Sequence, residues 1–434
     1  MPFDHAGLAR RKIAIIGGGI SGMGAAHFLT GHHRVVLIEA GPRLGGHART
    51  RIAGKRGDQP VDTGFIVFNR PNYPRLNTLF QQLDVPVAPS TMTFGASIQG
   101  GRIEYGLRDI GTVFAQRRNI ARPAFLRMIR DIFRFNGRAE AVADTLGPSA
   151  TIGSLLQSLR TGPWFRDYYL SPLSGAIWST PVTRILDFPA RAMVDFFRNH
   201  ALLHHSGQHQ WYTVRGGSEQ YVQRLESDLR QRGAEMRLSS PVAAVRRIPG
   251  GVEVKDRHGE WERFDDVIFA THSDDTLRLL ADPAPAERAA LSAIAYQPNE
   301  VTLHADPSVM PNRRACWSAW NYAEAPDKRC DRIDLTYWMN TLQPIPADDP
   351  LFVTLNSTRP IREELIYDQT VLRHPVYDLG AFAAQEVLAK RNGTARTWFC
   401  GAWMKNGFHE DGLASAADVA DSILSQSVFE TAAQ

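Results

Sequence analysis

Residues 12–22 read KIAIIGGGISG, and this stretch decides the fold of the chain. Its first five residues form a short, mostly apolar run typical of a buried strand, and Met23 to Leu29 are compatible with a helix. Gly17, Gly19 and Gly22 stand between the two as G-x-G-x-x-G. The first glycine permits a sharp turn, the second lets the backbone approach a pyrophosphate, and the third lets helix and strand pack closely. The stretch therefore predicts a Rossmann-like dinucleotide-binding unit.

A second strand and an acidic residue strengthen this prediction. Val35 to Ile38 form another apolar run, and Glu39 follows it, twenty residues after Gly19. A carboxylate at this position accepts hydrogen bonds from both ribose hydroxyls of an adenosine and repels a 2′-phosphate. The pattern therefore disfavours NADP.

Two segments after this strand narrow the choice of dinucleotide. Residues 39–50 read EAGPRLGGHART, and residues 61–65 read VDTGF. With these segments the chain resembles the flavin-containing amine oxidase superfamily, which includes monoamine oxidases, protoporphyrinogen oxidase and phytoene desaturases. The resemblance implies FAD rather than NAD, with the first segment beside the pyrophosphate and ribityl chain and the second beside the isoalloxazine ring. The cofactor-binding residues predicted in this part of the chain are Gly17, Gly19, Ile20, Ser21, Gly22, Glu39, Ala40, Arg43, Gly45, Gly46, His47, Asp62, Thr63, Gly64 and Phe65.

A group of strands is expected in the middle of the chain. Met236 to Val245, Gly251 to Val254 and residues 267–270 favour three short strands, interrupted by a Pro-Gly-Gly turn. In the resembled superfamily such a unit returns to the FAD-binding domain. The resemblance implies that Val242 contacts the adenine through its backbone.

The C-terminal part predicts a strand in residues 398–403 (WFCGAW) and a helix beginning near residues 407–413 (GFHEDGL). The resemblance implies that this helix points its N-terminus at the flavin, where its dipole stabilises negative charge on the reduced ring. Ala402 stands where the superfamily usually has an acid. The predicted contacts here are Gly401, Ala402, Asp411, Gly412 and Leu413.

Together these pieces predict an α/β fold. A Rossmann-like, GR2-type FAD-binding domain would be built from the discontinuous segments 1–90, 210–290 and 392–434. Residues 91–209 and 291–391 would then form an α+β substrate-binding domain. A chain of 434 residues with 43% hydrophobic and 22% charged residues is large enough for both domains, and this composition excludes a disordered chain.

Charge and cysteine usage restrict the function further. A net charge of +4 is too small to indicate nucleic-acid binding. Three cysteines without a C-x-x-C pair, and no H-E-x-x-H, predict neither a disulfide framework nor a metal site. We expect a cytoplasmic protein, because Met1 to Arg11 hold no secretory signal and residues 13–29 are too rich in glycine for a membrane span.

Residues 108–138 contain eight arginines interleaved with aromatic and aliphatic residues. Such a basic amphipathic stretch is typical of peripheral contact with an anionic membrane, here its inner face, or of a shelter for an acyl chain. An ordinary helix of the substrate domain with a solvated basic face has the same pattern. Both interpretations stay open at this point.

The chemistry is expected to be hydride removal from an organic substrate. No second dinucleotide motif is present that would bind NAD(P)H, so the electrons would leave to oxygen or another acceptor. Amine oxidases of the superfamily generally place a lysine opposite flavin N5, whereas this chain has no lysine between Lys255 and Lys328. His409 and Glu410 are the candidate catalytic residues, a titratable pair that could move a proton. His409 could instead anchor the loop, and Asp411 could be the N-cap of the helix.

Residues 407–413 and 211–218 (WYTVRGGS) resemble a bacterial branch of the superfamily that is linked to cyclopropane-fatty-acid-synthase-like methyltransferases. This resemblance implies a desaturase or oxidase of fatty-acyl chains in methylated or unsaturated lipids. The alternatives are an amine oxidase that produces hydrogen peroxide, a non-redox flavin-dependent isomerase, and an FAD-containing binding subunit of a methyltransferase. Because no cysteine is present at the last flavin turn, FAD is expected to bind noncovalently.

Overall fold

The structure is a computed structural model that describes residues 10–179, 182–203, 207–326 and 332–432. Most of the leading segment and Cys330 lie outside these residues. Within the described ranges no helix is both long and apolar enough to cross a bilayer.

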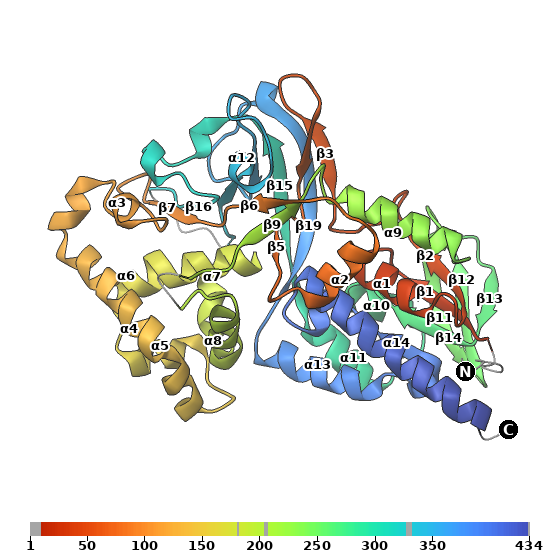
Figure 1. The fold of residues 1–434 in the computed structure, drawn as a ribbon. Helices are drawn as coiled ribbons and strands as arrows, with labels where there is room; N and C mark the ends of the chain where they lie inside the picture. Colours follow the sequence, from red (N-terminus) through yellow and green to blue (C-terminus); the bar gives the residue numbers. More distant parts are fainter. Residues whose placement is uncertain (1–9, 180–181, 204–206, 327–331, 433–434) are drawn as a thin grey trace, which may run out of the picture.

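A five-stranded sheet lies in the part of the molecule on the right of Figure 1. In spatial order it consists of β10 (Glu235–Arg237), β2 (Arg34–Ile38), β1 (Lys12–Ile16), β14 (Asp266–Phe269) and β20 (Thr397–Phe399). All neighbouring strands are parallel. Because both faces of a parallel sheet are covered, its central strands β1, β2 and β14 are nearly continuous apolar runs. The sheet confirms the predicted α/β fold.

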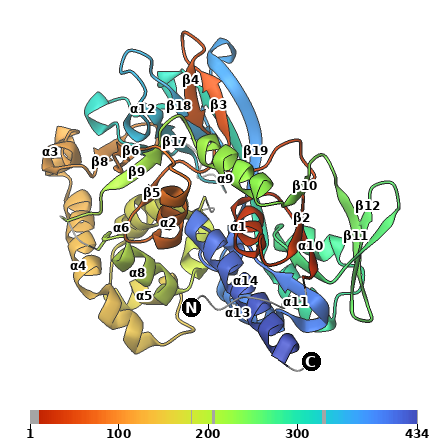
Figure 2. The ribbon, with the colours of Figure 1, turned by 45° about the vertical axis from the view of Figure 1, so that its right-hand side comes forward.

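Two helices from opposite ends of the chain lie side by side against this sheet, as both ribbon views show (Figures 1 and 2). They are α1 (Ile20–Leu29) and α14 (His409–Ala432). A side chain at Gly24 would place its Cβ 2.6 Å from Leu413 Cδ1, and one at Gly22 would lie 1.8 Å from the carbonyl oxygen of Gly17. Glycine at these positions therefore allows the close packing of α1 against α14 and β1.

A second, seven-stranded sheet forms the upper part of Figure 1. Its order is β19 (Ile366–Val376), β15 (Ala295–His304), β18 (Phe352–Leu355), β17 (Leu335–Trp338), β16 (Trp320–Ala323), β7 (Phe94–Ile98) and β8 (Ile103–Gly106). Its neighbouring strands are antiparallel except for β16 and β7.

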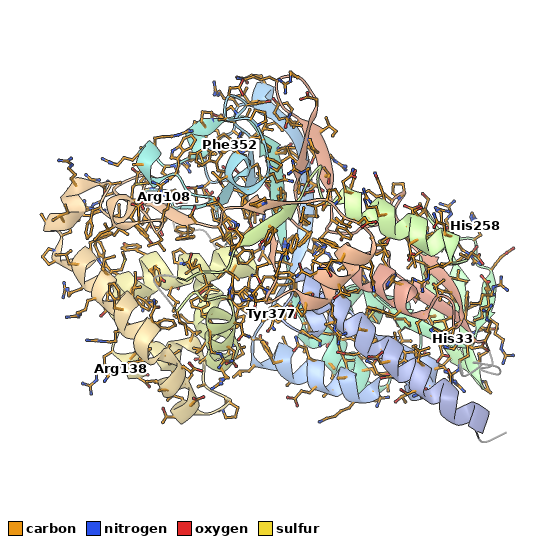
Figure 3. All side chains as sticks on the ribbon, in the orientation of Figure 1. His33, Arg108, Arg138, His258, Phe352 and Tyr377 are labelled. Atoms are coloured by element: carbon orange, nitrogen blue, oxygen red, sulfur yellow. The ribbon has the colours of Figure 1, made fainter. Side chains whose placement is uncertain are left out.

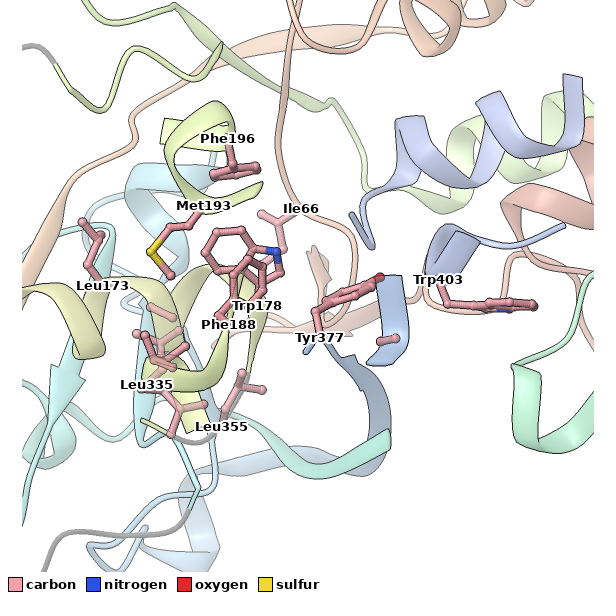
Figure 4. Packing of buried hydrophobic residues seen from close by; sticks show 14 of the residues in the cluster. Ile66, Leu173, Trp178, Phe188, Met193, Phe196, Leu335, Leu355, Tyr377 and Trp403 are labelled. Carbon is pink, nitrogen blue, oxygen red and sulfur yellow. The ribbon is translucent and has the colours of Figure 1, made fainter. Parts of the chain in front are cut away.

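Helices fill the region between residues 110 and 199. They are α3 (Ile110–Val113), α4 (Pro123–Leu146), α5 (Ile152–Leu159), α6 (Pro163–Phe165), α7 (Ser171–Trp178) and α8 (Ala190–Asn199). Their apolar faces meet in a buried cluster, where Trp178 lies 4.7 Å from Phe188 and 4.8 Å from Phe196 between ring centroids (Figure 4). Tyr377 and Trp403 extend this cluster toward the parallel sheet.

Smaller elements complete the fold. They are the strands β3 (Thr50–Ala53), β4 (Gln59–Asp62), β5 (Phe68–Asn69), β6 (Val87–Ser90), β9 (Trp211–Val214), β11 (Val242–Ile248), β12 (Gly251–Asp256) and β13 (Trp261–Phe264). The remaining helices are α2 (Pro74–Gln82), α9 (Glu219–Gln231), α10 (Ser273–Leu279), α11 (Pro285–Ala293), α12 (Met339–Leu342) and α13 (Leu379–Arg391). The exact domain boundaries stay a prediction.

One predicted strand was wrong. Residues 236–245 form the end of β10 and the start of β11, which belong to different sheets. Ser239 has φ +48° and Pro241 follows, so an extended strand cannot continue through this point. The break brings the segment before Val242 to the edge of the dinucleotide-binding loop, where Ser240 N–H donates to the carbonyl oxygen of Glu39.

Candidate active site

A large cavity of about 1270 Å³ joins the two sheets and the helical region. One end lies at the glycine-rich loop after β1, and the other is lined by α3, α4 and α7. Pockets for one small ligand are usually roughly 300–1,000 Å³, so this cavity has room for a cofactor together with a substrate.

Most of the predicted cofactor residues line the first end of the cavity. They are Gly17, Gly19, Ile20, Ser21, Glu39, Ala40, Gly45, Gly46, His47, Gly64, Phe65, Val242, Gly401 and Ala402. Gly17 has φ +105°, a backbone conformation that only glycine adopts readily. A Cβ at Gly19 would meet nothing within 4 Å, so this glycine leaves open space at the N-terminus of α1. The loop thus offers backbone N–H groups and a helix dipole to an anionic group.

Glu39 lines the cavity and also accepts hydrogen bonds from backbone N–H groups of the neighbouring loops. Its Oε2 accepts a hydrogen bond of 2.7 Å from Gly18 N–H, and its Oε1 accepts one of 2.7 Å from Gly41 N–H. Each carboxylate oxygen has a second lone pair, so ribose hydroxyls can still donate to Glu39. Glu39 therefore lies at the end of the cavity where its spacing predicts ribose binding, and the contact with a ribose stays a prediction.

Arg43 does not line the cavity, in contrast to the role implied for it. Its guanidinium donates to the carbonyl oxygens of Leu44, Gly46 and Ala48 at 3.0, 2.9 and 2.8 Å. These bonds fold the chain around Gly45, which has φ +105°. Arg43 thus shapes the Gly45-Gly46 loop, and direct contact with a pyrophosphate is left to the loop itself.

Asp62 and Thr63 are also set back from the cavity. Asp62 is fully buried and accepts hydrogen bonds from Thr50 Oγ1, Ser218 N–H and Gln343 Nε2 at 2.7 to 3.0 Å. Burial raises the pKa of this carboxyl to about 6. Three separate segments therefore meet at Asp62, which fixes the turn that places Gly64 and Phe65 at the cavity wall. Asp62 itself does not line the cavity.

His409 lies on the cavity wall with its ring held from two sides. Its Nε2 is 3.0 Å from the hydroxyl oxygen of Tyr221, and its ring stacks on Phe65 at 3.8 Å between centroids. Burial lowers the pKa of His409 to about 3, so the imidazole is neutral at physiological pH. The neutral imidazole has a lone pair for a proton beside the dinucleotide end, and the burial that lowers its pKa also makes it a weak base.

Glu410, the other candidate catalytic residue, points away from the large cavity. Its two carboxylate oxygens accept hydrogen bonds from Arg75 N–H and Leu76 N–H at 3.0 and 2.9 Å. These are free N–H groups in the first turn of α2, whose dipole favours a negative charge there. The structure thus assigns Glu410 to capping α2, which corrects the predicted proton-handling role.

The remaining predicted residues support the start of α14. The helix begins at His409, within the predicted residues 407–413. Asp411 Oδ2 accepts a hydrogen bond of 2.9 Å from Phe408 N–H. Asp411 therefore bonds back to the residue before the helix and is not itself the N-cap. A Cβ at Gly412 would lie 2.8 Å from Ser21 Oγ, which shows how closely this turn approaches α1. Like Gly22, Gly412 and Leu413 serve packing beneath the cavity rather than lining it.

Sequence reasoning missed two histidines at the cavity wall, beside the predicted His47. His272 and His374 lie 5.8 and 5.5 Å from His47 between ring centroids, and all three line the cavity. Desolvation lowers the pKa of His272 and of His374 to about 3. The available signal was the position of His272 just after β14, because loops at the carboxyl ends of parallel strands build ligand sites.

The neighbouring acidic residues do not form a metal centre. Ligand atoms of His272, Asp274 and Asp275 lie within 4.8 Å of one another. However, Arg373 forms ion pairs of 2.5 Å with both aspartates, and Arg278 also pairs with Asp275, so two guanidinium groups balance the two carboxylates. The group is therefore an ion-pair cluster at the edge of the cavity.

The far arm of the cavity is apolar. It is lined by Met92, Phe94, Leu107, Ile110, Val113, Phe114, Ile129, Ile132, Phe133, Tyr169, Leu173, Ile177, Leu202, Trp320 and Tyr337. These side chains come from α3, α4, α7, the second sheet and the segments that connect them, which sequence periodicity could not bring together. The arm suits a long apolar group.

The dinucleotide end fits FAD. The turn at Gly17, the open space at Gly19 and the carboxylate of Glu39 are suited to its pyrophosphate and ribose. His47 lines this space, and its Nε2 is buried without a hydrogen-bond partner among the described residues. A sequence model of flavin-containing amine oxidoreductases matches residues 20–328. The chain belongs to this family. It is an FAD-dependent oxidoreductase.

Comparisons with individual proteins agree with this family. The chain is 37% identical over 98 residues to the FAD-dependent oxidoreductase dbaF of Emericella nidulans, a match that covers 22% of this chain and 20% of the relative. The matches span about a fifth of the length of the curated relatives. A redesigned putrescine oxidase has a TM-score of 0.71 at 16% identity, covering 96% of this chain and 99% of that one. The CLA-producing fatty acid isomerase of P. acnes has a TM-score of 0.67 at 14% identity, covering 95% and 98%. At these identities the two structures show a shared fold.

Proposed function

We propose that this oxidoreductase removes a hydride from an activated, for example allylic, carbon of a fatty-acyl chain in a methylated or unsaturated lipid. The observation that carries the proposal is the continuity of the cavity. The same space that Gly19 and Glu39 line continues into the apolar arm of α3, α4 and α7. An acyl chain lying in this arm would present its carbons to the cofactor end.

The charges along the cavity favour such a substrate over an amine. Its described lining includes three carboxylates, those of Glu39, Asp109 and Asp275. Asp109 accepts a hydrogen bond from Thr112 N–H and forms an ion pair with Arg108. Asp275 forms an ion pair with Arg373. Glu39 lies at the dinucleotide end. An ammonium group in the apolar arm would therefore be buried without an unpaired carboxylate, which is costly.

The chain's own residues would orient the substrate and receive a proton. Bound FAD supplies a two-electron acceptor for the hydride. When a C–C bond becomes a double bond, the second hydrogen leaves as a proton, and the neutral His409 is the candidate base. Apolar side chains such as Leu173 and Ile177 exclude water and hold the chain in place, which lowers the entropic cost of reaching the reactive geometry.

The test combines spectroscopy and lipid mass spectrometry. The FAD-loaded protein is mixed anaerobically with methylated or unsaturated phospholipids, and the visible flavin spectrum is followed. Bleaching together with products lighter by two hydrogens supports the proposal. An unchanged spectrum and unchanged lipids, with peroxide released from a panel of amines, would overturn it in favour of amine oxidation. Products of unchanged mass but shifted double bonds would show an isomerase.

A substitution in the arm ties the activity to this cavity. Ile177→Trp fills space next to Leu173 and should raise KM for long acyl chains at least tenfold. Ile177→Val keeps the shape of the side chain and serves as the matched control, with KM near that of the unsubstituted protein. An unaffected KM in Ile177→Trp would place the substrate elsewhere.

A further inference from the structure

The positive charge of the whole protein is concentrated in one segment. Residues 108–138 contain eight arginines and two aspartates, a net charge of +6, which exceeds the +4 of the entire chain. The remaining residues therefore carry a net negative charge of two. Figure 1 places this segment, which contains α3 and α4, at the edge of the molecule away from the parallel sheet.

Several of these arginines are exposed and lack an acidic partner. Arg108 pairs with Asp109, and Arg130 lies 3.5 Å from Asp131. By contrast, within the part of the chain that the structure describes, no ion pair involves Arg117, Arg127 or Arg138, all of them exposed. Figure 3 shows Arg138 at the outer edge of α4. Their charges are available to an external anion.

Large apolar side chains are exposed beside these arginines. The exposed fractions are 79% for Ile110, 57% for Ile120, 44% for Leu126 and 60% for Phe133. Because an α-helix turns 100° per residue, Leu126 and Phe133, seven residues apart, project from nearly the same side of α4. We call these four side chains and the exposed arginines of residues 108–138 the basic apolar surface.

Part of this surface borders the apolar arm of the cavity. Ile110 and Phe133 line the cavity and are also among the most exposed apolar side chains of the described residues. They come from α3 and α4, so the arm reaches the surface between these two helices. A group that enters here reaches the dinucleotide end without leaving the cavity.

We propose that the basic apolar surface docks on a bilayer containing anionic phospholipid. The arginines would contact lipid phosphates while Ile110, Ile120, Leu126 and Phe133 enter the acyl boundary, the arrangement of interfacial amphipathic helices. Nucleic acid would satisfy the arginines but leave the apolar side chains in water, so a membrane fits both features. Docking goes beyond the proposed function, which it would serve by placing the cavity opening against acyl chains.

Vesicle sedimentation tests the proposal with the full-length, FAD-loaded protein. Vesicles of phosphatidylcholine are compared with equal mixtures of phosphatidylcholine and phosphatidylglycerol. Binding should be at least tenfold stronger to the anionic vesicles and should weaken in 0.5 M salt, roughly as expected for several arginines near a charged surface. Equal binding to both vesicles, no binding, or binding to a DNA duplex without binding to vesicles would overturn it.

Substitutions locate the binding on this surface. Arg127→Gln/Arg138→Gln and Ile120→Ser/Leu126→Ser alter exposed residues outside the cavity lining, and each pair should weaken binding about tenfold or more. Arg257→Gln and Ile52→Ser change equally exposed residues on other elements and should bind normally. Equal losses in these controls would refute the assignment. Binding is measured without turnover, so vesicle binding by a protein that oxidises no lipid would refute the proposed function and leave the docking surface standing.

Discussion

His409 Nε2 lies 3.0 Å from the hydroxyl oxygen of Tyr221; His409 lines the cofactor end of the cavity, and Tyr221 is a buried residue of α9. The contact joins residues 188 positions apart in the chain. Burial keeps the tyrosine protonated by raising its pKa and keeps the imidazole neutral. Together with the stacking of Phe65, this fixes the ring in one orientation, as a proton-accepting group requires.

His409→Gln should therefore lower kcat by about 100-fold or more, the usual range for loss of a general base. Tyr221→Phe should have a smaller effect, because it removes only the orienting hydrogen bond. FAD absorbance of both variants should remain unchanged, which separates chemistry from cofactor loss. With a pKa near 3, His409 should cause no inflexion in the profile of kcat between pH 5 and 8. A kcat of His409→Gln equal to that of the original protein would leave His409 as a loop anchor.

Glu410→Gln should affect stability rather than catalysis. The neutral amide no longer places a negative charge at the first turn of α2, and one of its two terminal atoms is a poor acceptor for the N–H groups of Arg75 and Leu76. We expect the free energy of unfolding to fall by about 1 kcal/mol, with kcat within a factor of two. Urea denaturation and steady-state kinetics measure both. Glu226→Gln, at an exposed i,i+4 pair with Arg230, is the control and should change neither quantity. A large loss of kcat in Glu410→Gln would restore its catalytic role.

Glu39→Ala should weaken FAD binding by roughly 10- to 100-fold, because charge-assisted hydrogen bonds to Gly18 and Gly41 are lost together with the ribose acceptor. Titration of the apoprotein with FAD measures the dissociation constant. Glu253→Ala removes an exposed carboxylate paired with Arg246 and should bind FAD normally. Equal affinities in Glu39→Ala and the original protein would exclude ribose recognition by this residue.

Precipitation of the protein with acid should release FAD as the intact cofactor. No cysteine is among the described residues that line the cavity, and Cys316 and Cys400 are buried elsewhere. Chromatography of the supernatant should recover all of the flavin as FAD. Yellow colour retained in the washed precipitate would show a covalent bond through another side chain.

The parts of this protein that sequence predicted are those with local causes. The strand, glycine turn and helix at residues 12–29 depend on neighbouring residues, and the spacing from Gly19 to Glu39 is set by one βαβ repeat. Backbone contacts around Gly46 and Gly401 follow from the same motifs. In these places the residue type and its position in the chain are enough to define the geometry.

Side-chain directions could not be predicted in the same way. Arg43 and Asp62 carry charges at motif positions, yet the structure turns Arg43 onto nearby backbone carbonyls and surrounds Asp62 with groups from three distant segments. Glu410 is adjacent to His409, but successive helical residues point 100° apart, so one faces the cavity and the other α2. His374 reaches His47 only through the pairing of β19 with β15, which no local pattern encodes.

The buried carboxyl of Asp62 gives stability a pH dependence of defined sign. Its pKa is about 6 in the folded protein against 3.8 when unfolded, so the folded state retains the proton over this interval. The contribution of this bound proton to the free energy of unfolding is fully present below pH 3.8 and is lost as pH rises through 6. Between pH 4 and 7 the free energy of unfolding of the original protein should therefore fall by about 2–3 kcal/mol relative to Asp62→Asn, which has no titrating group there. Urea denaturation of both proteins with saturating FAD at each pH provides the measurement. The free energy of unfolding of the original protein relative to Asp62→Asn could instead stay constant or rise with pH. That result would show that the hydrogen bonds from Thr50 and Ser218 outweigh the cost of burial and keep Asp62 ionised.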